Sequence, residues 1–181
     1  MSIKIGVVMD PISKVKVQKD SSMAMMLEAQ ARGYEIYYME MQDLYLEQGV
    51  CRATAAKIKV FDDTNHWYDL DAQEDINVAD LDAVLMRKDP PFDTEFIYAT
   101  YMLERAEIAG TLIVNKPQSL RDCNEKLFTA WFPDLTPKTL VTRNNQKIRE
   151  FHKENKDIII KPLAWVVLLS SVSAKMILML G

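Results

Sequence analysis

The chain has 181 residues and a formal net charge of −4, with 49% hydrophobic and 27% charged residues. This is the composition of a globular protein, long enough for one domain and part of a second. Its mild acidity provides no electrostatic surface for nucleic acid, and no apolar run reaches the roughly 20 residues of a membrane-spanning helix.

The start of the chain predicts a strand, a helix and a second strand. Residues 3–9 form a short apolar run suited to a buried strand. Asp20, Ser21 and Ser22 are candidate caps for a helix start, and Gly33 fits the left-handed position that often follows a helix end. Residues 34–39 predict the next strand. This order implies a parallel pair of strands joined by a right-handed crossover.

The next segment predicts an antiparallel hairpin and a return to the sheet. Residues 44–60 contain two β-capable runs, and Gly49 after Gln48 can supply the positive φ of a tight turn. The acidic segment 65–82 is typical of irregular surface chain. Residues 83–86 are again apolar, and residues 83–87 predict a further buried strand.

A long helix and another strand are predicted after residue 88. Two consecutive prolines cannot continue the preceding strand, and Asp93 can cap the helix that follows. Gly110 ends the helix, and residues 111–115 predict a strand. The apolar stripe of the helix consists of Phe96, Ala99, Leu103 and Ala106. The first part of the chain is therefore predicted to be an open, mainly parallel α/β sheet covered by helices.

A second sheet is predicted to begin in the last third of the chain. Residues 119–132 and 145–154 indicate helices, and residues 138–142 and 157–162 indicate strands. The predicted organisation is an α/β domain over residues 1–122, an incomplete second domain over residues 123–163 and an apolar tail over residues 164–181.

Two charged residues follow predicted parallel strands directly. Asp10 and Arg87 stand at the carboxyl ends of their strands, where ligands bind in open α/β sheets. The alternative is that the "DP" and "DPP" sequences merely end the strands, and the residues alone favour it. No GxGxxG sequence and no Walker loop is present.

Other candidate residues are isolated in the sequence. Lys126 and Lys161 lie next to apolar runs, which taken alone indicates solvated lysines at element ends. His66 and His152 have no neighbouring ligand-type residues and are typical of surface histidines. No metal site is predicted from these residues.

The two cysteines, Cys51 and Cys123, lack the spacing of metal ligands. They indicate reduced thiols in a cytoplasmic protein rather than a disulfide. The first ten residues lack the basic start, apolar core and cleavage site of a signal peptide.

Several long stretches of the chain resemble one protein family. They are "VMDP", "DSSMAMMLEAQARGYE", "YMEMQDLYL", "LMRKDPPFDTEFIYATYMLERAE", "GTLIVNKPQSLRDCNEKLFTAWF", "LTPKTLVTRN" and "DIIIKPL". Together they closely resemble the bacterial glutathione synthetases, from near the start of the chain to Leu163. The resemblance implies an ATP-grasp fold, in which residues 1–122 form the domain that precedes the ATP-grasp domain and residues 123–163 begin the latter.

The resemblance also implies an activity and site residues. The family joins glycine to γ-glutamylcysteine, uses ATP and Mg²⁺, and forms homo-oligomers. Lys126 in "NEKLFT" and Lys161 in "IIIKP" match lysines that contact the nucleotide. Asp10, Arg87 and Asp89 are assigned to the peptide substrate, where a guanidinium can grip a carboxylate with two hydrogen bonds. No metal ligand is assigned within this chain.

The resemblance stops abruptly after Leu163. The family continues with Asp-Gly-Met-Gly-Gly-x-Ser-Ile-Phe-Arg, a glycine-rich loop over the phosphates, whereas this chain continues with "AWVVLLSSVS". Codons for residues 164–173 can be chosen so that a shifted reading frame encodes Met-Gly-Gly-Ala-Ser-Ile-Phe-Arg-Val. The tail is therefore expected to be a frameshifted translation. The alternative is a genuine C-terminus that packs as a strand or a helix.

Three functional hypotheses follow. The first is a glutathione synthetase by descent, an ATP-dependent ligase that passes through an acyl phosphate. The second is that this chain is a non-catalytic fragment able to fold and associate. The third, which disregards the resemblance, is a flavodoxin-like binding module. That hypothesis needs phosphate-binding glycines or hydroxyls after the first strand, where only Ser13 is available.

Overall fold

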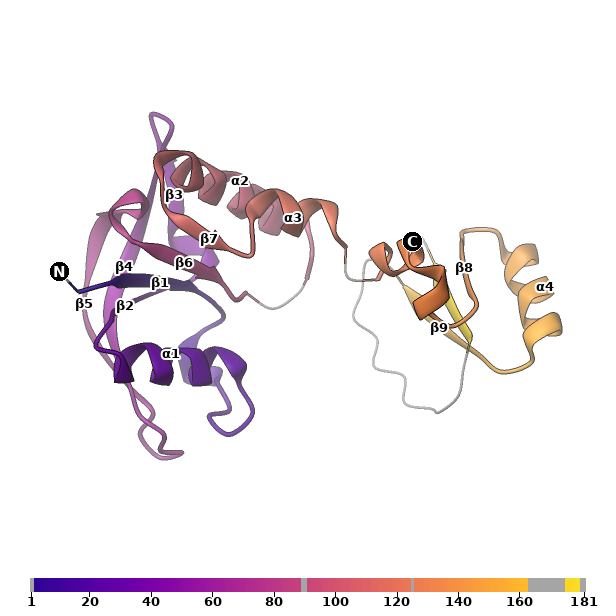
Figure 1. The fold of residues 1–181 in the computed structure, drawn as a ribbon, viewed down its shortest axis with the longest axis horizontal. Helices are drawn as coiled ribbons and strands as arrows, with labels where there is room; N and C mark the ends of the chain where they lie inside the picture. The colour runs from indigo at the N-terminus through magenta and orange to yellow at the C-terminus, as the bar shows by residue number, and fades with distance from the viewer. Residues whose placement is uncertain (1, 89–90, 125, 163–174, 180–181) are drawn as a thin grey trace. The chain divides into compact units, whose positions relative to one another are not determined.

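The computed structural model of the chain describes residues 2–88, 91–124, 126–162 and 175–179 (Figure 1). The described residues divide into two compact units. The first contains residues up to 88 together with 94–120, and the second contains 91–93 and the residues from 121 onward.

The first unit is built on a seven-stranded sheet in which four neighbouring strands are parallel. Their order is β2 (Glu35–Met39), β1 (Lys4–Val8), β6 (Ala83–Met86) and β7 (Leu112–Val114). Helix α1 (Ser21–Ala31) connects β1 to β2, and α2 (Thr94–Ala109) connects β6 to β7. Figure 1 shows these helices on opposite faces of the sheet. The predicted α/β class and the crossover connection are confirmed.

Helix α1 begins where the sequence predicts. The Oδ1 atom of Asp20 accepts hydrogen bonds from the backbone N–H groups of Ser22 (2.7 Å) and Met23 (3.0 Å). These bonds satisfy donors that have no partner inside the helix. Gly33, after the helix, has a φ of 78°, as predicted. The cap fixes the point at which Ser21 and Ser22 emerge at the edge of the sheet.

Replacing the cap residue is expected to lower the stability of the first unit. Asp20→Ala leaves two N–H groups of α1 without their acceptor and should reduce the free energy of unfolding by about 1 kcal/mol. Asp20→Asn retains an acceptor of similar geometry and should cost clearly less. Urea unfolding followed by far-ultraviolet circular dichroism measures both variants. Equal losses in the two would show that the cap hydrogen bonds contribute little.

The helices bury their apolar stripes against the two faces of the sheet. Met23 and Met26 of α1 are fully buried on one face. On the other face, all four residues of the predicted α2 stripe are buried, and Leu103 is 0% exposed. Gly110 then adopts a φ of 118° at the helix end. Spacing at helical period therefore identified the buried face of α2 correctly.

Three antiparallel strands extend the sheet beyond β2. They are β3 (Leu44–Glu47), β4 (Val50–Val60) and β5 (Tyr68–Asn77). The predicted hairpin between β3 and β4 is confirmed, with positive φ at both Gln48 (48°) and Gly49 (80°).

The expectation for residues 65–82 was wrong. Instead of irregular chain, most of this segment forms β5, a ten-residue strand paired with β4. Its residues are largely exposed, so the strand has no alternation of apolar and polar positions that could reveal it. Backbone pairing with β4 holds it in place, and its acidic side chains are typical of an edge strand in solvent.

A charged cluster adds to the pairing of β5 with its neighbours. A guanidinium N–H of Arg52 donates to Asp75 over 2.7 Å, and the Tyr45 hydroxyl donates to the same carboxylate over 2.7 Å. The Arg52 guanidinium, through this hydrogen bond, holds the pKa of Asp75 below its ordinary value. The three side chains come from β4, β5 and β3, so they join all three antiparallel strands.

The second unit contains a small parallel sheet. It is formed by β8 (Thr139–Thr142), β10 (Lys175–Met179) and β9 (Ile158–Pro162), in that spatial order. Helix α4 (Asn145–Asn155) connects β8 to β9 and is capped by Asn144. The strands at 138–142 and 157–162 and the helix between them are thus confirmed, apart from small differences at their ends.

The helix expected over residues 119–132 is much shorter in the structure. Helix α3 covers only Pro117–Asp122, and the chain then forms 3₁₀ turns over Phe128–Trp131 and Pro133–Leu135. The side chain of Asn124 accepts hydrogen bonds from the backbone N–H groups of residues 126 and 127, both at 3.0 Å. Such local bonds compete with helical ones, which explains the interruption.

Of the apolar tail over residues 164–181, the structure describes residues 175–179, which form β10. Its backbone lies between β8 and β9 and is parallel to both. A strand is the packing that the alternative of a genuine C-terminus anticipates. Residues 164–174 and 180–181 lie outside the described residues, and the frameshift stays a prediction about the encoding DNA. No helix of the described chain is long and apolar enough to cross a membrane.

Candidate substrate site at the carboxyl edge of the sheet

The first unit brings Asp10 and Arg87 together at one edge of its sheet. Strands β1 and β6 are parallel neighbours in which Val8 is paired with Met86. The backbone N–H of Arg87 donates to the carbonyl of Val8 over 2.7 Å, so the chains are still adjacent beyond the strand ends. Asp10 and Arg87 both line a cavity of about 270 Å³ on the α1 side of this edge, which we call the α1-face cavity.

The guanidinium of Arg87 is held by the start of α1. Its Nε–H donates to the hydroxyl of Ser22 over 3.1 Å, and an Nη2–H donates to the hydroxyl of Ser21 over 2.8 Å. Both partners are neutral, so they orient the side chain without balancing its charge. An arginine has five N–H donors in a planar fork. Arg87 can therefore offer further donors and a full positive charge to an anionic ligand.

Asp10 is paired with a residue that the sequence did not single out. The Nζ of Lys88 lies 3.0 Å from Oδ1 of Asp10, with the Lys88 side chain 17% exposed and that of Asp10 42% exposed. Lys88 directly follows Arg87 but does not line the α1-face cavity. It lines a second cavity instead, next to α2. The consecutive residues Arg87 and Lys88 thus line cavities on opposite sides of the sheet edge.

The wall of the α1-face cavity carries charges of both signs. Lys14 and Lys19 join Arg87, whereas the carboxylates of Asp10 and Asp20 face the same space. Asp20 is already engaged in capping α1. A cavity with separated positive and negative groups suits a small dipolar ligand that carries both a carboxylate and an ammonium group.

The loop that forms this wall is fixed at Ile12. The backbone N–H of Ile12 donates to the Tyr38 hydroxyl over 3.2 Å, and its carbonyl accepts from the Trp67 indole over 2.9 Å. The Tyr38 hydroxyl in turn donates to Glu40 over 2.8 Å. Burial raises the pKa of Tyr38 well above its ordinary value, so its proton stays in place near neutral pH. The loop next to Asp10 is therefore bound from β2 and from Trp67, which directly precedes β5.

The sequence did not identify the serines that orient Arg87. The "DSS" sequence indicated a helix start, and Asp20 does cap α1, but nothing in one sequence connects Ser21 and Ser22 to a residue more than sixty positions away. Asp89, the remaining residue assigned to the peptide, lies outside the described residues.

The two lysines assigned to the nucleotide lie in the second unit. Lys126 follows Asn124 in the turn before the 3₁₀ segment Phe128–Trp131. Lys161 is half-buried in β9, where its backbone is in register with Leu178 of β10. They share a unit with each other and not with Asp10 and Arg87.

Histidine and cysteine side chains show no shared site. His66 contacts Asp69 over 3.0 Å at the surface, and His152 is exposed on α4. Cys51 and Cys123 are free, and burial raises the pKa of Cys51 to about 11, so this thiol is unreactive near neutral pH. Over residues 2–88, 91–124, 126–162 and 175–179, no three His, Cys, Asp or Glu side chains gather as metal ligands.

Comparison with known proteins agrees with this architecture. Residues 3–121 match the family model of the prokaryotic glutathione synthetase N-terminal domain, and residues 125–167 match that of the ATP-grasp domain of the same enzymes. A glutathione synthetase of Vibrio vulnificus strain YJ016 is 66% identical over 163 residues, which cover 90% of this chain and 51% of that protein. One from Escherichia coli O127:H6 is 64% identical over 161 residues, covering 89% and 51%. The chain spans about half the length of these relatives.

Solved structures show a similar fold at low sequence identity. The ATP-grasp ligase PsnB, complexed with a phosphomimetic variant of its minimal precursor, Mg and ADP, aligns with a TM-score of 0.53 and 22% identity, covering 94% of this chain and 57% of PsnB. PsnB complexed with its minimal precursor aligns with a TM-score of 0.51 and 23% identity, covering 97% and 58%. These likenesses extend to the fold alone. One family model matches residues 3–121, which is most of this chain, and the Vibrio vulnificus relative is 66% identical over 90% of it. The chain therefore belongs to the prokaryotic glutathione synthetase family.

Proposed function

We propose that this chain derives from an ATP-dependent ligase that joins glycine to γ-glutamylcysteine, and that its α1-face cavity holds the peptide. The observation that carries the proposal is the convergence of Asp10 and Arg87 on one cavity at the carboxyl edge of the sheet. That edge is where open α/β sheets bind ligands. The family relationship is the reason that we propose γ-glutamylcysteine as the ligand.

The charges of γ-glutamylcysteine match those of the cavity. The peptide carries one ammonium group and a carboxylate on its glutamyl residue, and a second carboxylate on its cysteine. Arg87, already oriented by two serine hydroxyls, takes the glutamyl carboxylate in a two-pronged hydrogen bond. Asp10 attracts the ammonium group. This arrangement leaves the cysteine carboxylate, the group that reacts, outside the grip of Arg87.

The reaction needs an activated carboxylate because a free carboxylate is a poor acyl donor. The γ-phosphoryl group of ATP passes to the cysteine carboxylate and leaves ADP. The amine of glycine then attacks the acyl phosphate, forms the amide bond and expels phosphate with loss of a proton. Negative charge builds on phosphate oxygens, and Lys126 and Lys161 are the cations we assign to them.

A different role for the chain as it stands is favoured by its sequence after Leu163. No glycine follows before Gly181, so a glycine-rich phosphate loop cannot form there. The 181-residue chain would then be a non-catalytic fragment that folds and associates with other copies, as the homo-oligomers of the family do. The free thiols suit the reducing cytoplasm, which we propose as its compartment.

The peptide site is tested by changing Arg87. Arg87→Ala removes a charged hydrogen-bond donor pair and should weaken γ-glutamylcysteine binding by at least about tenfold. Arg87→Lys keeps the charge without the planar fork, so its affinity for the peptide should lie between those of the unmodified chain and of Arg87→Ala. Binding is measured by amide chemical-shift titration of the 181-residue chain, which detects weak complexes.

Arg105→Ala is the matched control for this experiment. This substitution removes the same charge, but from α2. Arg105 donates there to the carbonyl of Gly49 and does not line the α1-face cavity. The affinity of the Arg105→Ala variant for the peptide should equal that of the unmodified chain. If both arginine variants bind equally well, or if the shifts fall away from the cavity wall, the peptide is not held at this site.

A further inference from the structure

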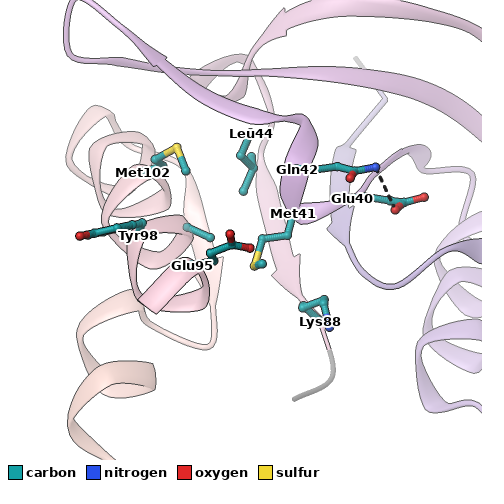
Figure 2. Close-up of a pocket in the computed structure, with 9 residues that line it drawn as sticks. Glu40, Met41, Gln42, Leu44, Lys88, Glu95, Tyr98 and Met102 are labelled. Carbon is teal, nitrogen blue, oxygen red and sulfur yellow. Dashed lines mark hydrogen bonds between the residues drawn. The ribbon is translucent and has the colours of Figure 1, made fainter. Parts of the chain in front are cut away.

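A second cavity lies next to α2, on the other side of the same sheet edge (Figure 2). Its volume is about 430 Å³, and we call it the α2-face cavity. It is lined from the end of β2, the turn Met41–Asp43, the start of β3, the chain after β6 and the first half of α2. A cavity of this size accommodates a ligand as large as an amino acid or a dipeptide.

The lining combines an apolar floor with a few charged groups. Met41, Leu44 and Met102 supply apolar surface, and methionine side chains adapt readily to the shape of a ligand. The polar groups include the carboxylates of Glu40 and Glu95 and the ammonium of Lys88. A mostly apolar cavity with few polar groups is typical of small-molecule sites.

The two carboxylates differ in how they are held. Glu40 accepts hydrogen bonds from the Tyr38 hydroxyl over 2.8 Å and from the Gln42 amide over 3.4 Å. Glu95 lies in the first turn of α2, and Figure 2 shows it extending from the helix toward Met41. Glu95 is therefore the carboxylate better placed to receive an ammonium group of a ligand.

Lys88 connects the two cavities. It lines the α2-face cavity, yet its Nζ lies 3.0 Å from Asp10, which lines the α1-face cavity. A second connection runs through Tyr38, whose hydroxyl donates to Glu40 and accepts from the backbone of Ile12, two residues after Asp10. The two cavities thus share an ion pair and a hydrogen-bonded chain.

From this geometry we infer that the α2-face cavity binds a zwitterionic amino acid with an apolar side chain and that its occupancy is coupled to the α1-face cavity through Lys88. The ligand ammonium pairs with Glu95, its side chain packs on Met41, Leu44 and Met102, and its carboxylate pairs with Lys88. Because that carboxylate competes with Asp10 for Lys88, ligand binding weakens the Lys88–Asp10 ion pair, and the ion pair weakens ligand binding. Only the effect of coupling on the peptide rests on the proposed function.

L-methionine is a suitable probe, and two analogues dissect its recognition. We expect it to shift the amide resonances of Gln42 and Met102 in the 181-residue chain. 3-(Methylthio)propylamine lacks the carboxylate, and 4-(methylthio)butanoate lacks the ammonium. Each loses one charged contact and should bind at least about tenfold more weakly. Equal binding of the ammonium-free analogue, or no shifts at these amides, would overturn the assignment.

Glu95→Gln tests the ammonium partner directly. It should weaken L-methionine binding by about tenfold, whereas Glu107→Gln should not change it. The control residue lies on the same helix and loses the same charge, but it does not line the cavity. A Glu95→Gln variant that binds like the control would remove Glu95 from the site.

The coupling is tested without the peptide, so its result is independent of the proposed function. Asp10→Asn removes the carboxylate charge that competes with the ligand for Lys88 and should tighten L-methionine binding severalfold, by the reciprocity of coupled equilibria. Lys88→Ala should weaken it. Asp62→Asn, a charge change on an exposed residue outside both cavities, should have no effect. An Asp10→Asn variant with unchanged or weaker affinity would show that the cavities are not coupled through Lys88.

Discussion

The 181-residue chain, purified free of host enzymes, is expected to show no glycine-dependent ATP cleavage in the presence of γ-glutamylcysteine and Mg²⁺. Its sequence supplies Lys126, Lys161 and the residues of the α1-face cavity, but no glycine-rich loop after Leu163. Preorganised groups around the developing charge are usually the largest source of catalysis, and losing one donor costs about a hundredfold or more. A glycine-rich loop presents several backbone N–H donors, so its replacement removes more than one of them at once. A coupled assay for ADP release measures the reaction.

The predicted frameshift supplies the positive control, because a chain translated in the shifted frame after Leu163 is expected to carry the Gly-rich motif. Glycine-dependent ATP cleavage should then appear. In that restored protein, Lys161→Ala should lower the rate by about a hundredfold, since it removes a cation that we assign to the phosphates. Lys156→Ala, a change at an exposed lysine just before β9, should leave the rate unaltered. Glutathione formation by the unmodified 181-residue chain would contradict this expectation.

Leu103→Ala is expected to destabilise the first unit by about 3 kcal/mol. Leu103 is 0% exposed at the centre of the α2 stripe, where the helix covers its face of the sheet. Truncation removes buried apolar atoms and leaves a cavity, and for a buried leucine the two effects together cost roughly 2–5 kcal/mol. Urea unfolding followed by far-ultraviolet circular dichroism gives the change in the free energy of unfolding.

Ile108→Ala provides the comparison for this prediction. Ile108 lies on the same helix and is 68% exposed, so its truncation removes little buried surface. The change in its free energy of unfolding should stay within about 0.5 kcal/mol, as for most surface substitutions. Similar losses in the two variants would show that the burial of Leu103 does not determine the cost of truncation on this helix.

Much of the fold could be predicted from local patterns. The cap at Asp20, the positive φ at Gly33 and the buried stripe of α2 follow from the chemistry of single residues or of one helical face. Such features depend on neighbours within a few positions along the chain. The placement of Asp10 and Arg87 at one edge followed from the parallel order of their strands alone.

Features that depend on distant partners escaped this reasoning. Strand β5 has no apolar alternation, and it exists because β4 offers a row of backbone partners. The helix expected over residues 119–132 ends early because the Asn124 side chain takes backbone donors that the helix would use. Neither the pairing of β5 with β4 nor the competition for backbone donors at Asn124 can be judged without the folded chain.

The sequence by itself determined the family, the α/β class and the positions of Asp10 and Arg87 beyond their strands. These follow from motifs and periodicities that are local in the chain. The tertiary structure alone decided that Ser21 and Ser22 orient Arg87 and that Lys88 joins Asp10 while lining the opposite cavity. Hydrogen bonds and ion pairs act over about 3 Å in space, and one sequence contains no record of which distant residues come that close.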